Sequence, residues 1–141
     1  LHKYTKKQFI QEFQDDTYKY KLIHTPKQTV YASRPHKYQE GYKVFISTTD
    51  KYKVFVDNCG MTQSIVFIMC KNKEEAEKYK LMIEHPLYVF INNICRWGNF
   101  NNIRILQSFP IPAIDYDGDH EKIYKYFNIN QDEINYISSN L

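Results

Sequence analysis

Residues 92–102 hold the side chains of this chain that are best suited to contact a ligand. The segment contains Asn92, Asn93, Arg96, Trp97, Asn99, Asn101 and Asn102 around Gly98. An arginine can donate two parallel hydrogen bonds, an amide can donate and accept, and an indole offers a flat aromatic face. These are the groups that read base edges and stack on bases.

The segment therefore predicts contacts with nucleic-acid bases. The predicted base contacts are Gln63, Asn93, Arg96, Trp97 and Asn99. For any single asparagine an ordinary loop role is the better interpretation, and Trp97 could be buried. As a cluster beside a basic sheet, however, the residues favour recognition.

Positive charge is concentrated in the N-terminal part of the chain. Residues 1–54 carry 11 Lys and Arg against 5 Asp and Glu, residues 55–103 carry 5 against 5, and residues 104–141 carry 3 against 6. A basic segment attracts a polyanion, whereas an acidic one does not. The predicted phosphate contacts are Arg34, Lys37, Lys43, Lys51 and Lys53.

A repeated sequence pattern supports the predicted phosphate contacts of two of these lysines. Residues 42–47 and 52–57 both begin Tyr-Lys-Val-Phe, and the four residues between them predict a β-hairpin. If the registers match, Lys43 and Lys53 lie on comparable faces, and a half-solvated sheet could present both to a phosphate backbone. Ordinary outward-facing lysines are an equally good interpretation.

The sequence contains no recognisable catalytic or metal-binding motif. No Gly-rich loop follows a strand, and the five histidines include no i, i+4 pair. Asp115, Asp117 and Asp119 resemble the start of a calcium loop, but Tyr126 occupies the twelfth position, where a Glu is required. The three cysteines are widely spaced and predict neither a disulfide framework nor a zinc site. We predict no catalytic residue and no metal ligand.

Several strands are expected to position these side chains. Alternation over residues 18–33, interrupted by a Pro-containing turn, predicts two strands. Residues 64–70 are apolar enough for a central strand, and residues 103–109 predict a last strand that Pro110 and Pro112 close.

Helices are expected between and after these strands. Asn72 with Glu75 predicts a helix from about Lys73, with Leu81 facing away from the core. Pro86 opens a second helix, whose predicted core-facing residues are Leu87, Phe90, Ile91, Ile94 and Cys95. Two short helices follow, the second of them capped by Asn130.

The predicted fold class is α/β (α+β), a mixed or antiparallel sheet with flanking helices and a short helical C-terminal tail. We expect residues 1–112 to form one domain and residues 113–141 to pack on it. No run of about 18 apolar residues occurs, and residues 1–7 lack the apolar core of a signal peptide, so we expect neither a membrane-spanning helix nor a signal peptide within this sequence. Because Leu1 is not an initiator Met, we expect the chain to be a segment of a longer protein.

Residues 42–137 resemble the C-terminal target-recognition region, the TaqI-like specificity domain, of adenine-specific DNA methyltransferases of restriction-modification type. The residues that carry the resemblance are Gly60-Met61-Thr62-Gln63-Ser64-Ile65, Glu74-Glu75-Ala76-Glu77, Leu87-Tyr88-Val89-Phe90, Phe109-Pro110-Ile111-Pro112 and the run 123–137. The last run is the most distinctive and matches the tail in which such enzymes end.

This resemblance implies a DNA-reading part without its catalytic domain. The family's Asn/Asp-Pro-Pro-Tyr/Phe motif and its methyl-donor loop do not occur in the chain. The implied partners are double-stranded DNA and a covalently attached methyltransferase domain, which would bind S-adenosylmethionine and flip the adenine. The implied location is the cytoplasm of a prokaryotic or virus-infected cell, without membrane association. Two alternatives remain: a protein-protein interaction module that uses exposed aromatic residues, and a small enzyme of unrecognised type.

Overall fold

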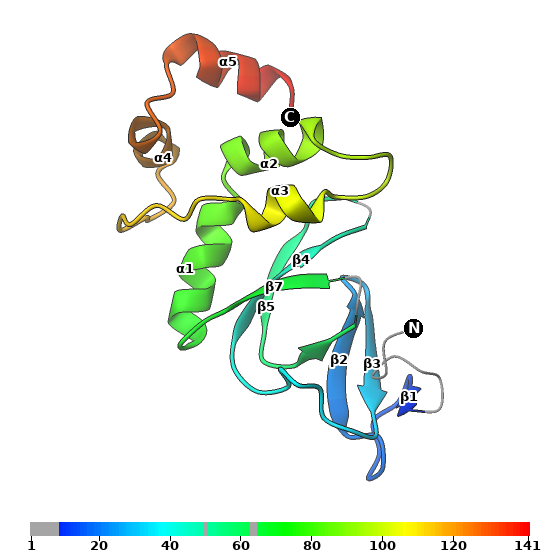
Figure 1. The fold of residues 1–141 in the computed structure, drawn as a ribbon. Helices are drawn as coiled ribbons and strands as arrows, with labels where there is room; N and C mark the ends of the chain where they lie inside the picture. The colour runs from blue at the N-terminus through cyan, green and yellow to red at the C-terminus, as the bar shows by residue number, and fades with distance from the viewer. Residues whose placement is uncertain (1–8, 50, 63–64) are drawn as a thin grey trace.

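The structure is a computed structural model, and it describes residues 9–49, 51–62 and 65–141. These residues form a mixed α+β fold with two mostly antiparallel sheets and five helices, which confirms the predicted fold class (Figure 1). The strands are β1 (Ile10–Gln11), β2 (Tyr20–Thr25), β3 (Gln28–Ala32), β4 (Lys43–Ser47), β5 (Val54–Asp57), β6 (Gly60–Met61) and β7 (Ile65–Met69). The helices are α1 (Lys73–Ile83), α2 (Pro86–Ile94), α3 (Ile103–Gln107), α4 (His120–Tyr126) and α5 (Gln131–Ser139).

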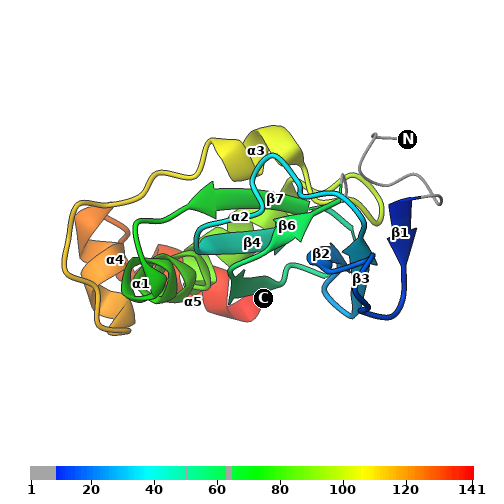
Figure 2. The same ribbon diagram turned by 90° about the horizontal axis from the view of Figure 1, so that it is seen from below.

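The two sheets have the strand orders β1-β3-β2-β6 and β5-β4-β7. The prediction of a central strand over residues 64–70 is wrong, because β4 takes the central position and β7 lies at the edge of its sheet, with Met69 exposed. β2 pairs antiparallel with β3 and parallel with β6, and β4 pairs antiparallel with both β5 and β7. The hairpins predicted over residues 18–33 and 42–57 are therefore confirmed. Strands β1 and β3 lie at one end of the molecule and α4 lies at the other (Figure 2).

Strand β4 is buried on both faces because it is the central strand of its sheet. Val44 and Ile46 pack with Ala76 and Ile83 of α1. Phe45, which points to the opposite face, packs in a second cluster with Ile23, Cys59, Met61 and Ile65. Side chains alternate along a strand, so Lys43 and Ser47 share the face of Phe45 and meet the first sheet.

The first two helices begin where the sequence predicts them. The Asn72 side chain accepts a hydrogen bond from the Glu75 amide at 2.8 Å, and Pro86 is the first residue of α2. Ala76, Met82 and Ile83 of α1 are buried, whereas Leu81 is exposed. The cap residue and the apolar spacing together account for this helix.

Two predictions about the later elements are wrong. Residues 103–107 form helix α3 rather than a strand, because the Asn102 side chain caps the Arg104 amide at 3.1 Å. A short apolar run of β-branched residues does not by itself distinguish the two structures. In α2, Ile94 is exposed, while Tyr88 and Asn92 are buried in its place.

The C-terminal helices pack against α1 and α2. Ile123 and Tyr124 of α4 and Ile137 of α5 share a core cluster with Met82 and Tyr88. Asn130 and Glu133 form a complete capping box at the start of α5, as the sequence predicts. No helix in the described part of the chain has both the length and the apolar character needed to cross a bilayer.

Candidate nucleic-acid interface

Three lysines from the connecting segments of two different sheets line one cavity, which we call the lysine pocket. Lys27 comes from the β2–β3 turn, and Lys51 and Lys53 come from the connection between β4 and β5. Thr25, Pro26 and Thr49 complete the lining, and the cavity has a volume of about 330 Å³. Within the described residues, none of the three ammonium groups has a hydrogen-bond or ion-pair partner. The pocket therefore offers an anion three ammonium groups that have no partner among the described residues.

A tight turn at residues 97–100, which we call the aromatic hairpin, presents two rings to solvent. The Trp97 and Phe100 backbones exchange two hydrogen bonds of 3.1 Å. Gly98 has a φ of +59° and Asn99 does not have a positive φ, a combination that fits a type II′ turn. The Trp97 side chain is 85% exposed and that of Phe100 is 61% exposed. The alternative of a buried Trp97 is thus wrong.

The aromatic hairpin lies beside the lysine pocket. Phe100 pairs with Thr49, a residue of the pocket lining, in an antiparallel bridge. The Asn101 amide donates to the Thr48 carbonyl at 2.9 Å. Figure 1 shows the α2–α3 loop next to the turn that joins β4 to β5. One edge of the molecule thus combines unpaired positive charge with exposed aromatic faces.

Buried asparagines hold this arrangement in place. The Asn101 side chain donates to the Ser47 carbonyl at 2.7 Å and accepts from the Asn92 side chain at 3.1 Å. Both asparagines are almost completely buried. They position the hairpin against β4 and are not base-reading groups.

The remaining members of the 92–102 segment differ in accessibility. Asn93 and Asn99 are exposed, as their predicted role requires, and Arg96 is half-buried just before the hairpin. Asn102 is occupied as the cap of α3. Gln63, another predicted base contact, lies outside the described residues.

The predicted phosphate contacts fall into separate groups. Lys51 and Lys53 join Lys27 in the lysine pocket. Arg34 and Lys37 are exposed in the loop after β3, at the end of that strand opposite to Lys27. The Arg34 guanidinium lies 4.2 Å from the centroid of the Phe9 ring, and the Lys37 ammonium lies 5.2 Å from that of Tyr38. The five predicted contacts therefore do not form one surface.

Sequence reasoning missed Lys27. The residue lies in the predicted turn at residues 25–28, where a lysine is expected to be exposed. Its distance from Lys51 along the chain gave no sign that the two share a pocket. The exposed turn position was the only available signal.

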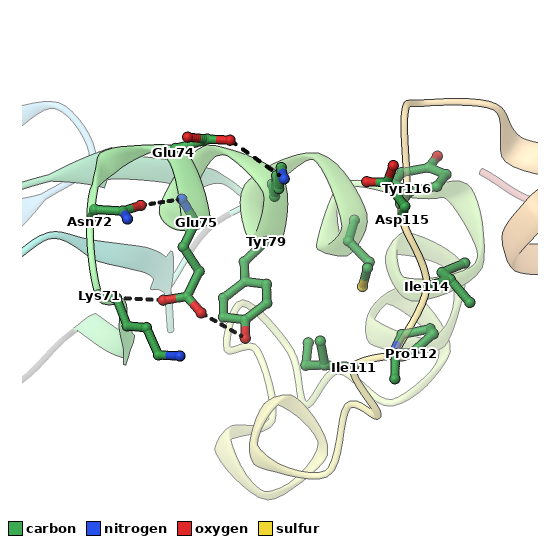
Figure 3. A pocket seen from close by; sticks show the side chains of 13 residues that line it. Lys71, Asn72, Glu74, Glu75, Tyr79, Ile111, Pro112, Ile114, Asp115 and Tyr116 are labelled. Carbon is green, nitrogen blue, oxygen red and sulfur yellow. Dashed lines mark hydrogen bonds and ion pairs between the residues drawn. The ribbon is translucent and has the colours of Figure 1, made fainter.

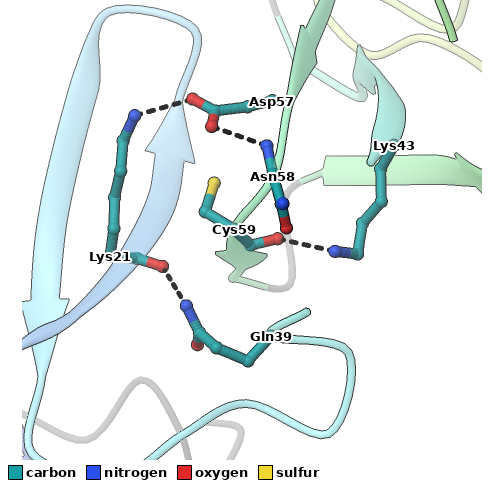
Figure 4. A network of polar contacts seen from close by, with 6 residues as sticks. All are labelled: Lys21, Gln39, Lys43, Asp57, Asn58 and Cys59. Carbon is teal, nitrogen blue, oxygen red and sulfur yellow. Dashed lines mark hydrogen bonds and ion pairs between the residues drawn. The ribbon is translucent and has the colours of Figure 1, made fainter. Parts of the chain in front are cut away.

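The prediction for Lys43 is wrong. Its side chain is completely buried, and its ammonium donates to the carbonyls of Glu40 at 3.2 Å and Gly41 at 2.6 Å. It also donates to the carbonyl of Cys59 at 3.0 Å, as Figure 4 shows. Burial lowers the pKa of this ammonium from its ordinary value. Lys43 lies opposite Asp57 in the β4–β5 register, not opposite Lys53. Because β4 is covered on both faces, Lys43 cannot reach a phosphate.

Neighbouring polar contacts connect the two sheets around Lys43. The Lys21 ammonium of β2 lies 2.7 Å from the Asp57 carboxylate of β5, and the pair raises the pKa of Lys21. The Gln39 side chain donates to the Lys21 carbonyl at 2.9 Å. Figure 4 shows these groups on either side of Cys59. This network stabilises the frame on which the interface is built.

A second cavity, of about 620 Å³, lies between α1 and residues 111–116 (Figure 3). The Glu75 carboxylate accepts from the Lys71 amide at 2.6 Å and from the Tyr79 hydroxyl at 3.4 Å. The Glu74 carboxylate lies 3.5 Å from the Lys78 ammonium. Both of these carboxylates are therefore already engaged by neighbouring groups.

The described residues contain no group of three His, Cys, Asp or Glu side chains placed to hold a metal ion. All three cysteines are free thiols. Burial raises the pKa of Cys59 to about 12, so this thiol stays protonated and is a poor nucleophile. The interface made by the lysine pocket and the aromatic hairpin is therefore the stronger candidate site.

Comparison with known families, curated proteins and solved structures finds no match for this chain. The resemblance to methyltransferase target-recognition regions therefore remains a prediction from the residues themselves.

Replacing Asn101 by Ala is expected to destabilise the protein by about 2–3 kcal/mol, because the Ser47 carbonyl and the Asn92 amide would lose their buried partner. The Asn92 side-chain oxygen already lacks a partner in the described part of the chain, so little compensation is expected. Urea denaturation measures the change. The matched control, Asn99→Ala in the exposed turn, should stay within about 0.5 kcal/mol of the parent. Equal effects of the two substitutions would contradict a positioning role for Asn101.

Proposed function

We propose that this chain is the duplex-DNA recognition module of an adenine-N6 DNA methyltransferase or combined restriction-modification enzyme. In this proposal the lysine pocket holds phosphates, with Arg34 and Lys37 as a second, separate contact. The proposed base contacts, next to the lysine pocket, are Asn93, Arg96, Trp97 and Asn99. The observation that carries the proposal is the position of three pocket lysines beside two exposed aromatic rings.

Electrostatics supports DNA as the partner. A lysine whose ammonium has no protein partner gives its charge to an external phosphate without first breaking an ion pair. Each phosphate neutralised in this way releases condensed counterions, so affinity becomes strongly dependent on salt. Within the part of the chain that the structure describes, Lys27, Lys51 and Lys53 are all of this kind, whereas Lys21 is already paired with Asp57.

The methyltransferase part of the proposal comes from the sequence resemblance alone. The chain carries no methyl-donor loop and no catalytic tetrapeptide. S-adenosylmethionine and the flipped adenine are accordingly assigned to the catalytic domain of the parent enzyme. The role of this chain is to select the DNA sequence on which that domain acts.

The triple variant Lys27→Ala, Lys51→Ala, Lys53→Ala is expected to bind all duplex sequences more weakly. If each lysine contacts one phosphate, the slope of log affinity against log salt should fall by about 3. The measurement is a titration with random-sequence duplex DNA between about 50 and 200 mM salt.

A triple variant with the same charge change provides the control. Lys73, Lys78 and Lys125 are exposed on α1 and α4, outside the lysine pocket. Their replacement by Ala should leave the salt slope close to that of the parent. If the two triple variants lose equal affinity, only overall charge matters and the pocket is not the phosphate site. Undetectable or salt-independent binding of the parent chain rejects the proposed function.

Exposed apolar side chains favour one other function, a protein-protein interaction module. Ile94, Trp97, Phe100 and Ile103 are all exposed within ten positions. Clusters of exposed apolar residues commonly mark protein interfaces. Such binding would depend weakly on salt and would survive removal of the pocket lysines, so the same titration series separates the two functions.

A further inference from the structure

The aromatic hairpin presents two rings on the same side of a fixed turn. Trp97 and Phe100 are directly opposite each other in an antiparallel bridge, and residues opposite each other in such a pair project to the same face. Neither ring contacts another aromatic ring in the part of the chain that the structure describes. With Trp97 85% exposed and Phe100 61% exposed, both residues are accessible to a flat partner.

The turn is held firmly even though its side chains are exposed. Its two backbone hydrogen bonds, the Thr49–Phe100 bridge and the buried Asn101 contacts fix the backbone on both sides of the rings. A ligand that stacks on these rings would not have to order a flexible loop first. Preorganisation of this kind reduces the entropy lost on binding.

A nucleic-acid base is the flat partner that the surroundings favour. Thr49 lines the lysine pocket and also pairs with Phe100. A nucleotide whose phosphate is bound in the pocket would therefore have its base close to the two rings. Stacking of a base on an aromatic side chain is favourable for every base, because each has a flat π-face. In a fully paired duplex the base faces are covered by their neighbours, and exposing them requires the bases to unstack.

Building on the proposed function, we infer that the aromatic hairpin binds an unstacked base. The preferred ligand is a duplex in which one nucleotide is unpaired, with Trp97 and Phe100 against the exposed base face and the pocket lysines on the adjacent phosphates. This defines a substrate class beyond duplex recognition, namely DNA opened at one position.

Trp97 is the only tryptophan in the chain and therefore provides a direct optical signal. The experiment uses a paired duplex and the same duplex with one unpaired adenine, both at about 200 mM salt. We expect the second ligand to bind about tenfold more tightly, the change that corresponds to about 1.4 kcal/mol of stacking. We also expect it to quench the emission of Trp97.

Substitutions in the hairpin test whether the rings cause this preference. Trp97→Ala and Phe100→Ala should each lose most of the preference for the unpaired adenine and keep the salt-dependent affinity for the paired duplex. Trp97→Phe retains an aromatic face and should keep part of the preference. Phe13→Ala, which removes an exposed ring outside the hairpin and the lysine pocket, should keep all of it.

The outcomes distinguish this inference from the proposed function. If both duplexes bind equally and Trp97 emission does not change, the stacking inference is overturned while DNA binding stands. If the preference persists in both alanine variants, the rings are not its source and the inference is again overturned. If neither DNA binds at any salt concentration, the proposed function fails and the inference fails with it.

Discussion

Lys43→Met is expected to destabilise the protein by about 3–5 kcal/mol. The three protons of the Lys43 ammonium are matched by three backbone carbonyls, those of Glu40, Gly41 and Cys59. Methionine has a similar length but no donor, so the three acceptors would remain in the interior without their partner. Removing one side of a buried charged interaction typically costs this amount, because the other side stays desolvated.

Lys53→Met is the matched control for this substitution. Lys53, like Lys43, follows a tyrosine and precedes a Val-Phe pair, but it is exposed just before β5. Its replacement should change the free energy of unfolding by no more than about 0.5 kcal/mol. Urea denaturation at neutral pH measures both variants. A loss below about 1 kcal/mol for Lys43→Met would show that Lys43 is not held as the structure describes.

The contrast between these lysines shows where local sequence stops being sufficient. The repeated Tyr-Lys-Val-Phe pattern correctly predicts a hairpin, because alternation and a short turn are local properties. Whether a lysine is buried depends on a third strand, β7, which makes β4 central, and on the first sheet, which covers the face of Lys43. Neither contact is encoded in the repeat.

The asparagines divide in the same way. Asn72 and Asn130 cap helices at positions that the sequence predicts, because each cap depends on residues three positions away. Asn101 instead bonds to Ser47, which is 54 positions away in the chain. Composition alone therefore could not separate the positioning asparagines from the exposed Asn93 and Asn99.

Only part of the candidate site could be predicted, because local sequence does not determine contacts between distant segments. Trp97 and Lys51 could be chosen by residue type and by their expected loop positions, and Lys53 by its outward-facing place in the predicted strand 52–57. Their proximity could not, since it requires Thr49 to pair with Phe100 across two elements far apart in the chain. Lys27 enters the site only because the two sheets pack together.

His85 links the start of α2 to the start of α4 and is expected to make the protein sensitive to acid. Its Nδ1 accepts from the Leu87 amide at 3.0 Å, and its Nε2 lies 3.0 Å from the His120 carbonyl, to which it donates. Both contacts fit a neutral ring with its proton on Nε2. Protonation of Nδ1 would place two donors against each other.

Burial lowers the pKa of His85 from 6.5 to about 4. Between these values the unfolded chain binds a proton that the folded chain does not, so the free energy of unfolding falls as the pH falls through this interval. The expected contribution is about 3 kcal/mol lost between pH 6.5 and pH 4, and none above pH 6.5. Urea denaturation at closely spaced pH values from about 7.5 to about 4 measures how the free energy of unfolding changes with pH.

His85→Asn isolates this contribution from that of carboxylates. Hydrogen bonds from the Tyr18 amide and from the Lys122 side chain lower the pKa values of Asp15 and Asp117, and these groups also lose stabilising contacts in acid. Asparagine can still cap Leu87 but cannot take up a proton, so the variant should be less stable at pH 7 and lose less stability on acidification. His120→Asn keeps the backbone acceptor of His85 and should retain the acid sensitivity. Parallel pH profiles for the parent and His85→Asn would mean that His85 is not the group that titrates.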